Sequence, residues 1–487
     1  MNLIQNFKQT WLFNVRGDIL AGIVVALALI PEAIAFSIIA GVDPMVGLYA
    51  AFSIALVIAF VGGRPGMISG ATGAMALLMI TLVADHGLEY LLAATILTGI
   101  IQILFGVFKL ASIMKFVPRS VMIGFVNALA ILIFTSQLQH FVGETWIMYA
   151  LVALTLAIIY ILPRFTTAVP STLVAIIVVT AIAIVMNMGV RTVGDMGNLS
   201  STLPVFALPN IPLTFETLMI ILPYSLALAV VGLLETLLTA SIVDDMTDTD
   251  SNKNKESRGQ GMANVVAGCF GGMAGCAMIG QSVINVKSGG RGRLSSLTAA
   301  VTLMFLIIVL GSVVVQIPMA ALAGVMIMVS IGTFDWSSLR NIHRIPRTDA
   351  AVMVVTVGTV VYTHDLSLGV LAGVLLSAVF FAWKVSKVNV HKIYHDKDRS
   401  VTYHVEGQLF FASVTDFLEK VDLFEDVDTV TFDISNSHLW DDSAIGAFDK
   451  IESKFEKRDI PVYYTGMNRE STQLYDRITG LSKASGH

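Results

Sequence analysis

Long runs of apolar residues alternate with short polar connections from residue 18 to residue 386. A bilayer core about 30 Å thick needs about 20 apolar residues to be crossed by a helix. We therefore predict an all-α, polytopic membrane domain with fourteen spans. They are expected at residues 18–40, 44–62, 71–83, 88–108, 117–138, 146–162, 168–188, 218–243, 261–274, 276–286, 297–316, 319–333, 350–363 and 367–386.

The third and tenth spans, 71–83 and 276–286, are too short to cross a bilayer, and glycines interrupt the chain beside each of them. Each is the third span in its half of the chain. Paired short, glycine-interrupted segments at corresponding positions are typical of inverted repeats that hold a binding site near the membrane midplane. Irregular backbone persists at that depth only where it lines protein or a water-filled cavity. The alternative is a pair of re-entrant turns with no function.

The overall composition supports a membrane protein. The chain is 55% hydrophobic and 13% charged, with a mean hydropathy of +0.78, whereas soluble domains are about 25% charged. This excludes an ordinary soluble enzyme, a disordered chain and a disulfide scaffold. The two cysteines, Cys269 and Cys276, lie in an apolar stretch without metal-site spacing. The net charge of −5 gives no reason to expect nucleic acid as a partner.

Basic residues gather on one side of the predicted spans. With the N-terminus in the cytoplasm, the cytoplasmic loops carry Arg64, Lys109, Lys115, Arg119, Arg164, Lys253, Lys255, Arg258, Lys287, Arg291, Arg293, Arg340, Arg344, Arg347, Lys384 and Lys387. The outer loops carry only Arg191. This asymmetry predicts a multi-pass protein of the cell membrane. The even number of spans places both termini in the cytoplasm. We expect no cleaved signal peptide, because residues 1–18 are polar and amphipathic.

Residues 401–487 differ from the rest of the chain, since they hold 24 charged residues, 16 of them acidic. Strand patterns alternate there with helical ones, which predicts a small α/β domain. Strands are expected at residues 401–405, 408–412, 429–434 and 462–465, and helices at 413–423, 443–457 and 469–479.

Two carboxylates, Glu32 and Glu235, lie inside strongly apolar spans, the first and the eighth. An ionisable group at this depth costs on the order of 2.5–3.5 kcal/mol, so it usually marks an ion or substrate path. Thr239 shares a helix face with Glu235. A carboxylate with a hydroxyl suits Na⁺, whereas a lone buried carboxyl suits a proton. The alternative is that each glutamate is a neutral packing residue bonded to a neighbouring helix.

The two short helices predict an anion site. Helix N-termini carry partial positive charge and free N–H donors, and small residues let an ion approach the backbone. The expected donors are Thr72, Gly73 and Ala74 on one helix, and Ile279, Gly280 and Gln281 on the other. The alternative is that the glycines serve helix packing alone.

Several of these segments resemble the sulfate-permease (SulP) family of anion transporters, and bacterial bicarbonate and dicarboxylate carriers in particular. The matching segments are residues 30–37, 47–49 and 235–239, Asn285 with residues 289–290, and the tail. The resemblance implies 7+7 inverted repeats, as in uracil permeases, within a transport domain of residues 1–390. A core domain (spans 1–4 and 8–11) would move as an elevator against a gate domain (spans 5–7 and 12–14). A homodimer is implied as well.

The resemblance also assigns roles to residues. Substrate positions fall on Glu32, Phe36, Thr72, Gly73, Ala74, Met75, Ile279, Gly280 and Gln281, and the cation positions, for Na⁺ or H⁺, fall on Glu235 and Thr239. Many relatives have a basic residue where Gln281 stands and a neutral amide where Glu32 stands. An anion would therefore be repelled unless a cation accompanied it. We predict obligatory cation-coupled symport of bicarbonate, sulfate or a dicarboxylate. The alternatives are an uncoupled anion channel or exchanger, or an anion sensor.

The tail, residues 391–487, resembles the STAS domain, similar to anti-sigma-factor antagonists, through residues 432–435 and 440–446. Ser443 matches the serine that those antagonists have phosphorylated and is a regulatory candidate. The alternative is that Ser443 is an N-cap residue. The chain has no nucleotide-binding G-x-x-x-x-G-K-[ST] loop and no nucleophile–base set. We therefore expect neither an enzyme nor a cofactor other than the coupling ion.

Overall fold

The computed structural model describes residues 10–111, 117–166, 170–197, 202–212, 214–395 and 399–485. The chain forms two compact units, Met1–Val374 and Leu375–His487, and the boundary falls within helix α16 (Leu366–Val385). Each unit is described by itself. One basic residue of the predicted charge asymmetry, Lys115, lies outside the described residues.

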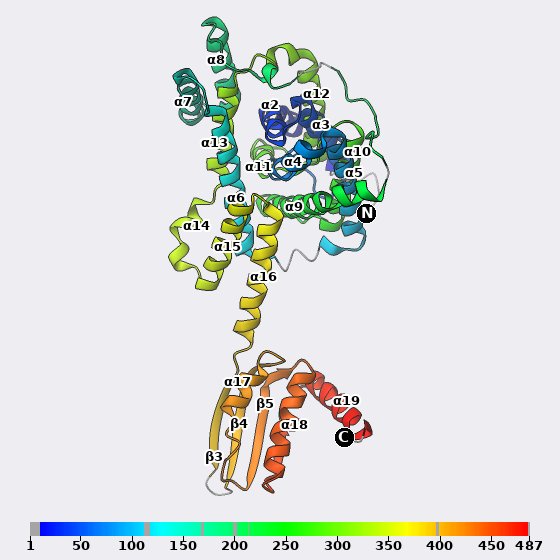
Figure 1. Ribbon diagram of the computed structural model, residues 1–487, viewed down its shortest axis with the longest axis vertical. Coiled ribbons are helices and arrows are strands. Elements are labelled where there is room, and N and C mark those ends of the chain that lie inside the picture. Colours follow the sequence, from blue (N-terminus) through cyan, green and yellow to red (C-terminus); the bar gives the residue numbers. More distant parts are fainter. Residues whose placement is uncertain are drawn as a thin grey trace. The chain divides into compact units, whose positions relative to one another are not determined.

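Helices make up almost all of the first unit (Figure 1). The α-helices are α2 (Val15–Ala40), α3 (Pro44–Val61), α4 (Gly73–His86), α5 (Leu88–Val107), α6 (Arg119–Leu138), α7 (Trp146–Ile161), α8 (Ser171–Val185), α9 (Phe215–Thr247), α10 (Lys253–Cys269), α11 (Ile279–Lys287), α12 (Arg293–Val314), α13 (Met319–Thr333), α14 (Trp336–Arg340), α15 (Arg347–Thr363) and the start of α16. Short 3₁₀ turns follow several of them.

Within the described residues, eight helices are long and apolar enough to cross a membrane, and three apolar helices, α4, α8 and α13, are shorter. These helices confirm a helical membrane body, although they do not establish the predicted number of fourteen spans. The span expected at 261–274 is wrong in its bounds. Helix α10 begins at Lys253, because the Asn252 side chain accepts a hydrogen bond from the Lys255 N–H, and it ends at Cys269, before Gly271 at φ 74°.

The helices of this unit pack in two groups (Figure 1). Helices α2, α3, α4, α5, α9, α10, α11 and α12 form the first group, in which α5 packs along α10, and α2 along α12. Helices α6, α7, α8, α13 and α15 form the second group, in which α6 packs against α13 and α15. Contacts between the groups are sparser and run mainly through α2–α13, α4–α6 and α2–α8.

A two-stranded β-ladder joins the two halves of the chain, which is an addition to the predicted helices. Strand β1 (Ser69–Gly70) pairs antiparallel with β2 (Cys276–Ala277). Helix α4 begins three residues after β1, and α11 begins two residues after β2. Their 14 and 9 residues, at about 1.5 Å per residue, fall short of a bilayer core. The ladder therefore holds the starts of two half-helices close together.

The second unit contains a four-stranded sheet in the order β3-β4-β5-β6. Strands β3 (Asn389–His395) and β4 (Ser400–Leu409) are antiparallel, whereas β4, β5 (Thr429–Leu439) and β6 (Val462–Thr465) are parallel. Helices α17 (Val414–Lys420), α18 (Asp442–Glu456) and α19 (Arg469–Ser485) complete this unit. Buried aromatic side chains form its core, where the Tyr403 and Phe432 rings stack at 5.1 Å.

Two strand predictions in this unit are wrong. The strands expected at 401–405 and 408–412 belong to one strand, β4, whose register shifts between His404 and Glu406, and which ends at Leu409. Strand β3 was not expected, because its side chains are almost all exposed and leave no apolar alternation to detect. It lies at the edge of the sheet, where one face needs no burial.

Candidate functional site

The first turns of α4 and α11 have backbone N–H groups without an intrahelical acceptor. In α4 the first intrahelical bond runs from the Ala76 N–H to the Thr72 carbonyl, so the N–H groups of Gly73 and Ala74 have no helical acceptor. In α11 the first such bond runs from Ser282 to Met278. The N–H groups at positions 279, 280 and 281 therefore have no helical acceptor either, and both helix starts carry partial positive charge.

The surroundings of these two helix starts differ. Gly280 is exposed, and a Cβ placed there would have no heavy atom within 4 Å. A Cβ at Gly73 would come within 2.9 Å of both the Phe36 ring and the Ile133 side chain. Open space therefore lies in front of α11, whereas side chains from α2 and α6 cover the start of α4.

Glu32 belongs to the α11 half of the site. It is half-buried on α2 beside Pro31, and its carboxylate is hydrogen-bonded to the Gln281 side chain in the first turn of α11. Phe36, one turn further along α2, is 3% exposed and packs over Gly73. Helix α2 thus contacts both half-helices, with the acidic side chain at one and the aromatic ring at the other.

Glu235 belongs to the α4 half of the site. Its side chain is 6% exposed, and the Cys276 thiol donates a hydrogen bond to Glu235 Oε2 at 2.9 Å. The Thr72 side chain is also hydrogen-bonded to this carboxylate, and Thr72 Oγ1 lies 3.1 Å from Cys276 Sγ. Since Thr72 is the N-cap of α4, Glu235 reaches the positive end of α4 through the capping residue.

Two predicted residues have other contacts. The Thr239 hydroxyl is fully buried and donates to the Glu235 backbone carbonyl at 2.7 Å. Thr239 therefore shares a helix face with Glu235, but this hydrogen bond goes to the backbone and not to the carboxylate. The end of the Met75 side chain lies against α9, because a Cβ at Gly232 would come within 3.1 Å of it. The Met75 backbone N–H donates to Thr72 Oγ1 at 3.5 Å.

The sequence matches the Sulfate permease family over residues 15–150 and 144–356, and the STAS domain over residues 391–484. The chain belongs to the sulfate permease family. This confirms the resemblance found in its residues. YbaR of Bacillus subtilis (strain 168), named as a candidate sulfate transporter, is 65% identical over 98% of this chain and 100% of its own length.

Two solved structures are similar to this sulfate permease family protein. The transmembrane domain of a cyanobacterium bicarbonate transporter, BicA, is 29% identical, with a TM-score of 0.65 over 75% of this chain and 97% of that one. The overall structure of SLC26A9 is 17% identical, with a TM-score of 0.83 over 99% of this chain and 88% of that one. The second likeness concerns the fold alone.

Cys276 is a site residue that the sequence did not single out. The thiol lies 41 positions from Glu235 along the chain and reaches it because β2 packs against α9, where the Ala277 N–H donates to Thr236 Oγ1. One signal was present. Cys276 precedes the second half-helix, in the segment that corresponds to the approach to Thr72 in the first half.

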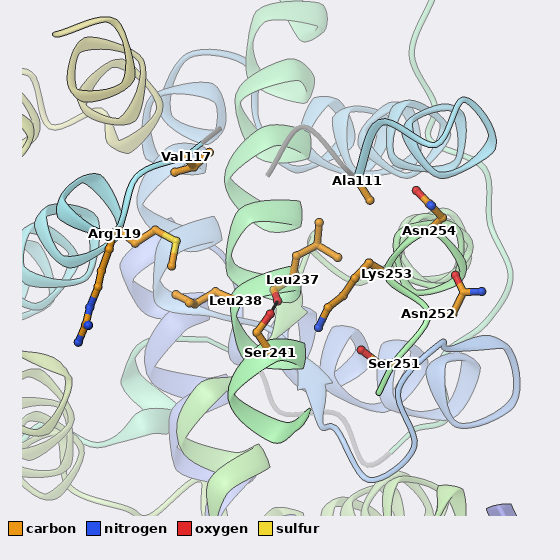
Figure 2. A pocket seen from close by; sticks show the side chains of 11 residues that line it. Ala111, Val117, Arg119, Leu237, Leu238, Ser241, Ser251, Asn252, Lys253 and Asn254 are labelled. Carbon is orange, nitrogen blue, oxygen red and sulfur yellow. Dashed lines mark hydrogen bonds between the residues drawn. The ribbon is translucent and has the colours of Figure 1, made fainter. Parts of the chain in front are cut away.

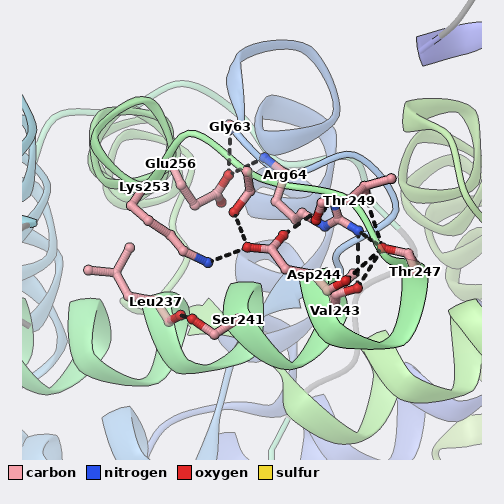
Figure 3. Close-up of polar contacts among 11 residues, drawn as sticks. Gly63, Arg64, Leu237, Ser241, Val243, Asp244, Thr247, Thr249, Lys253 and Glu256 are labelled. Atoms are coloured by element: carbon pink, nitrogen blue, oxygen red, sulfur yellow. Dashed lines mark hydrogen bonds and ion pairs between the residues drawn. The ribbon is translucent and has the colours of Figure 1, made fainter. Parts of the chain in front are cut away.

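A charged network fixes the loop that leads into β1 and α4 (Figure 3). The N–H groups of Gly63 and Arg64 donate to Glu256 Oε2, and the Arg64 guanidinium lies 3.3 Å from Asp244 Oδ1. The Lys253 ammonium contacts the other Asp244 oxygen at 2.7 Å. These bonds tie the loop to the ends of α9 and α10, so the α4 start is held to the helices that carry Glu235 and its neighbours.

A cavity of about 940 Å³ opens between α9 and the start of α6, which belong to different helix groups (Figure 2). Leu237, Leu238 and Ser241 line its α9 wall, and Arg119 lies on the α6 side. The predicted site residues are not part of its lining. Leu238 is nevertheless only one helical turn beyond Glu235, so the cavity approaches the α4 half of the site.

Ser443, the regulatory candidate, is exposed in the first turn of α18. The alternative role as an N-cap is wrong, because the cap is Asp441, whose carboxylate accepts the Ala444 N–H at 3.1 Å. Asp441 and Asp442 place two carboxylates directly before Ser443. Their charge opposes the effect of the free N–H groups on a phosphate at this position.

Proposed function

We propose that this sulfate permease family protein is a secondary transporter that carries a small anion together with a cation. Sulfate and bicarbonate are the favoured substrates, because its relatives are named for them, and a small dicarboxylate is the third candidate. The function is symport, with Na⁺ or H⁺ as the coupling ion. Both termini would lie in the cytoplasm, and the protein would work as a homodimer in the cell membrane.

One observation carries the proposal. Each half-helix start has a glutamate from the first helix of the opposite half of the chain, with Glu235 of α9 at α4 and Glu32 of α2 at α11. A helix N-terminus carries about half a positive charge, and a nearby carboxylate satisfies it as a substrate anion would. The glutamates and the anion therefore compete for the same positive ends.

The competition explains the need for a cation. Two like charges a few ångströms apart in a site shielded from water repel each other strongly. A cation that neutralises Glu235 removes this repulsion, and the partial positive charge of the α4 start is then no longer cancelled by the carboxylate. In our proposal the anion binds in the open space at Gly280, beside the backbone N–H groups of the α11 start that have no helical acceptor.

Transport requires the site to reach both sides of the membrane. We propose that the first helix group is the core domain, and that it moves as an elevator against the second group, the gate domain. The sparse contacts between the groups favour such sliding. The network around Arg64 favours movement of α4 with α9 and α10 as one body. The cavity beside α6 would be the cytoplasmic access to the site.

Uptake into proteoliposomes tests this function. The purified full chain would be supplied with labelled sulfate, bicarbonate or a dicarboxylate under an imposed Na⁺ gradient, and separately under a pH gradient. We expect saturable uptake of at least one anion that one gradient accelerates. Uptake independent of both gradients would contradict coupling and would favour the uncoupled channel or exchanger.

A further inference from the structure

The groups around Glu235 distinguish between the two coupling ions. We propose that Cys276 is a selectivity residue that excludes Na⁺ from the coupling site and so reserves it for the proton. This inference rests on the proposed function and deepens it. It concerns a side chain that belongs neither to the predicted cation pair nor to the predicted anion site.

The thiol occupies a position that a metal ion would need. Cys276 Sγ lies 2.9 Å from Glu235 Oε2 and directs its hydrogen at that oxygen. The Thr72 hydroxyl accepts from the Met75 N–H, so its own hydrogen can be donated to the Glu235 carboxylate or to the Cys276 sulfur, both of which it contacts. Proton donors therefore surround the carboxylate, and Na⁺ would have to displace them.

The remaining atoms offer Na⁺ little compensation. Hard cations bind several oxygen lone pairs, whereas sulfur suits soft metals. Unwound backbone carbonyls usually supply such oxygens in transporters. Here the Gly275 carbonyl already accepts hydrogen bonds from the Gln260 and Asn264 amides, at 2.9 and 3.0 Å. Cys276, Thr72 and Thr239 are 0–3% exposed, so water does not readily complete a coordination shell.

The same groups suit a proton, because a thiol and a hydroxyl each donate and accept hydrogen bonds. When Glu235 is charged, Cys276 and Thr72 donate to it. When Glu235 carries a proton, its O–H donates to one of them, and the contacts persist. The uptake of a proton therefore needs no rearrangement, whereas the uptake of Na⁺ needs a new set of ligands.

Four other carboxylates of this helix group have hydrogen-bond or ion-pair partners of their own. Glu32 is bonded to Gln281, and Glu89 of α5 accepts the Asn210 N–H. Asp244 is nine residues beyond Glu235, about 13 Å along α9, and is paired with Arg64 and Lys253. Glu256 of α10 accepts the N–H groups that precede β1. Among the described residues, Cys276 is the titratable group bonded to Glu235.

The test compares full-length wild type, Cys276→Ser and Cys276→Ala in proteoliposomes. Labelled sulfate uptake would be measured under a Na⁺ gradient at equal pH, and under a pH gradient without Na⁺. We expect a pH gradient to drive wild-type uptake, and Na⁺ to leave it unchanged. Serine adds a hard oxygen, so we expect a Na⁺ gradient to raise uptake at least threefold in Cys276→Ser. Alanine removes the thiol hydrogen without adding an oxygen ligand, and the proposal does not require a rise in Cys276→Ala.

Cys269→Ala is the matched control, because Cys269 is half-buried at the end of α10 and makes no contact with Glu235. It should behave as wild type. Anion exchange by each variant verifies that it is folded. If both Cys276 variants fail to fold, the Tm of the wild type is compared in NaCl and in choline chloride. A rise in Tm that is specific to Na⁺ would mean that the wild type binds Na⁺ and would overturn the inference.

The outcomes separate the two proposals. Na⁺-driven uptake by wild type, or variants of Cys276 that fold and stay insensitive to Na⁺, would overturn the role of Cys276 and leave symport intact. Uptake indifferent to both gradients in wild type would overturn symport itself.

Discussion

The half-site at α11 and the half-site at α4 are built from equivalent parts, yet their surroundings are opposite. Each has a half-helix start, a short β-strand before it and a glutamate from the other half of the chain. Gly280 faces open space, whereas Phe36 and Ile133 crowd Gly73. Glu32 is half-buried and Glu235 is almost fully buried. In our proposal, one repeated scaffold thus supplies an open half-site for the anion and a closed half-site for the cation.

The side chains at the glutamates continue this contrast. Glu32 faces an amide, Gln281, which cannot exchange a proton with it. Glu235 faces a thiol and a hydroxyl, which both donate and accept. The closed half-site is therefore suited to take up a cation without water, and the open half-site to receive an ion that arrives from solution.

The largest expected effect comes from Glu235→Gln. Glutamine keeps the size of the side chain and fixes it in a neutral form, so the cation can no longer be bound and released. We expect gradient-driven anion accumulation to fall to background, while exchange of internal for external anion continues. Accumulation and exchange of labelled sulfate, measured on the same proteoliposomes, check this. Accumulation at the wild-type level would show that Glu235 is not the coupling residue.

The next largest effect is expected for Gly280→Val, which fills the open space in front of α11. Since a Cβ there would meet nothing within 4 Å, the variant should fold normally. We expect KM for the anion to rise at least about tenfold, or 1.4 kcal/mol. Gly358→Val on α15, where a Cβ also meets nothing within 4 Å, is the control and should leave KM unchanged. Equal KM values for both variants would show that the anion does not bind in front of α11.

A smaller effect is expected for Thr72→Val, which removes the hydroxyl between α4 and Glu235. The loss of an N-cap costs about 1 kcal/mol of stability, and Glu235 loses one hydrogen-bond donor. We expect a modest fall in Tm and a several-fold weaker response of uptake to the imposed cation gradient. Thr72→Ser should restore both. Melting curves and gradient-driven uptake measure these effects. A normal response of Thr72→Val to the cation gradient would show that the N-cap hydroxyl plays no part in coupling.

The smallest effect is expected for Glu32→Gln in the open half-site. The amide removes a negative charge beside the α11 start, which should lower KM for the anion about threefold, within the usual range for a charge at a helix end. The dependence of uptake on pH should shift, while accumulation persists. A complete loss of accumulation would mean that Glu32, and not Glu235, binds the coupling cation.

The sequence predicted the helices and glutamates of this site better than the contacts that these residues make. Interrupted apolar runs predicted both short helices. The free-energy cost of an ionisable group inside an apolar span pointed to Glu32 and Glu235. Both signals can be found because each is local in the sequence. The contact of Cys276 with Glu235 depends on the packing of β2 against α9, which no local pattern predicts. The bounds of α10 were missed for a similar reason, since its polar first turns are buried by tertiary packing. Asp441, and not Ser443, is the α18 cap, and the two residues stand two positions apart and are both of types that cap well.

Proton movement driven by the anion alone tests the central claim most directly. Proteoliposomes holding wild type or Glu235→Gln, with a pH dye inside and equal pH on both sides, would receive an inward sulfate gradient without Na⁺. We predict that the interior acidifies with wild type as sulfate enters, and that Glu235→Gln exchanges sulfate without any pH change. Sulfate entry through wild type with no acidification would contradict the account.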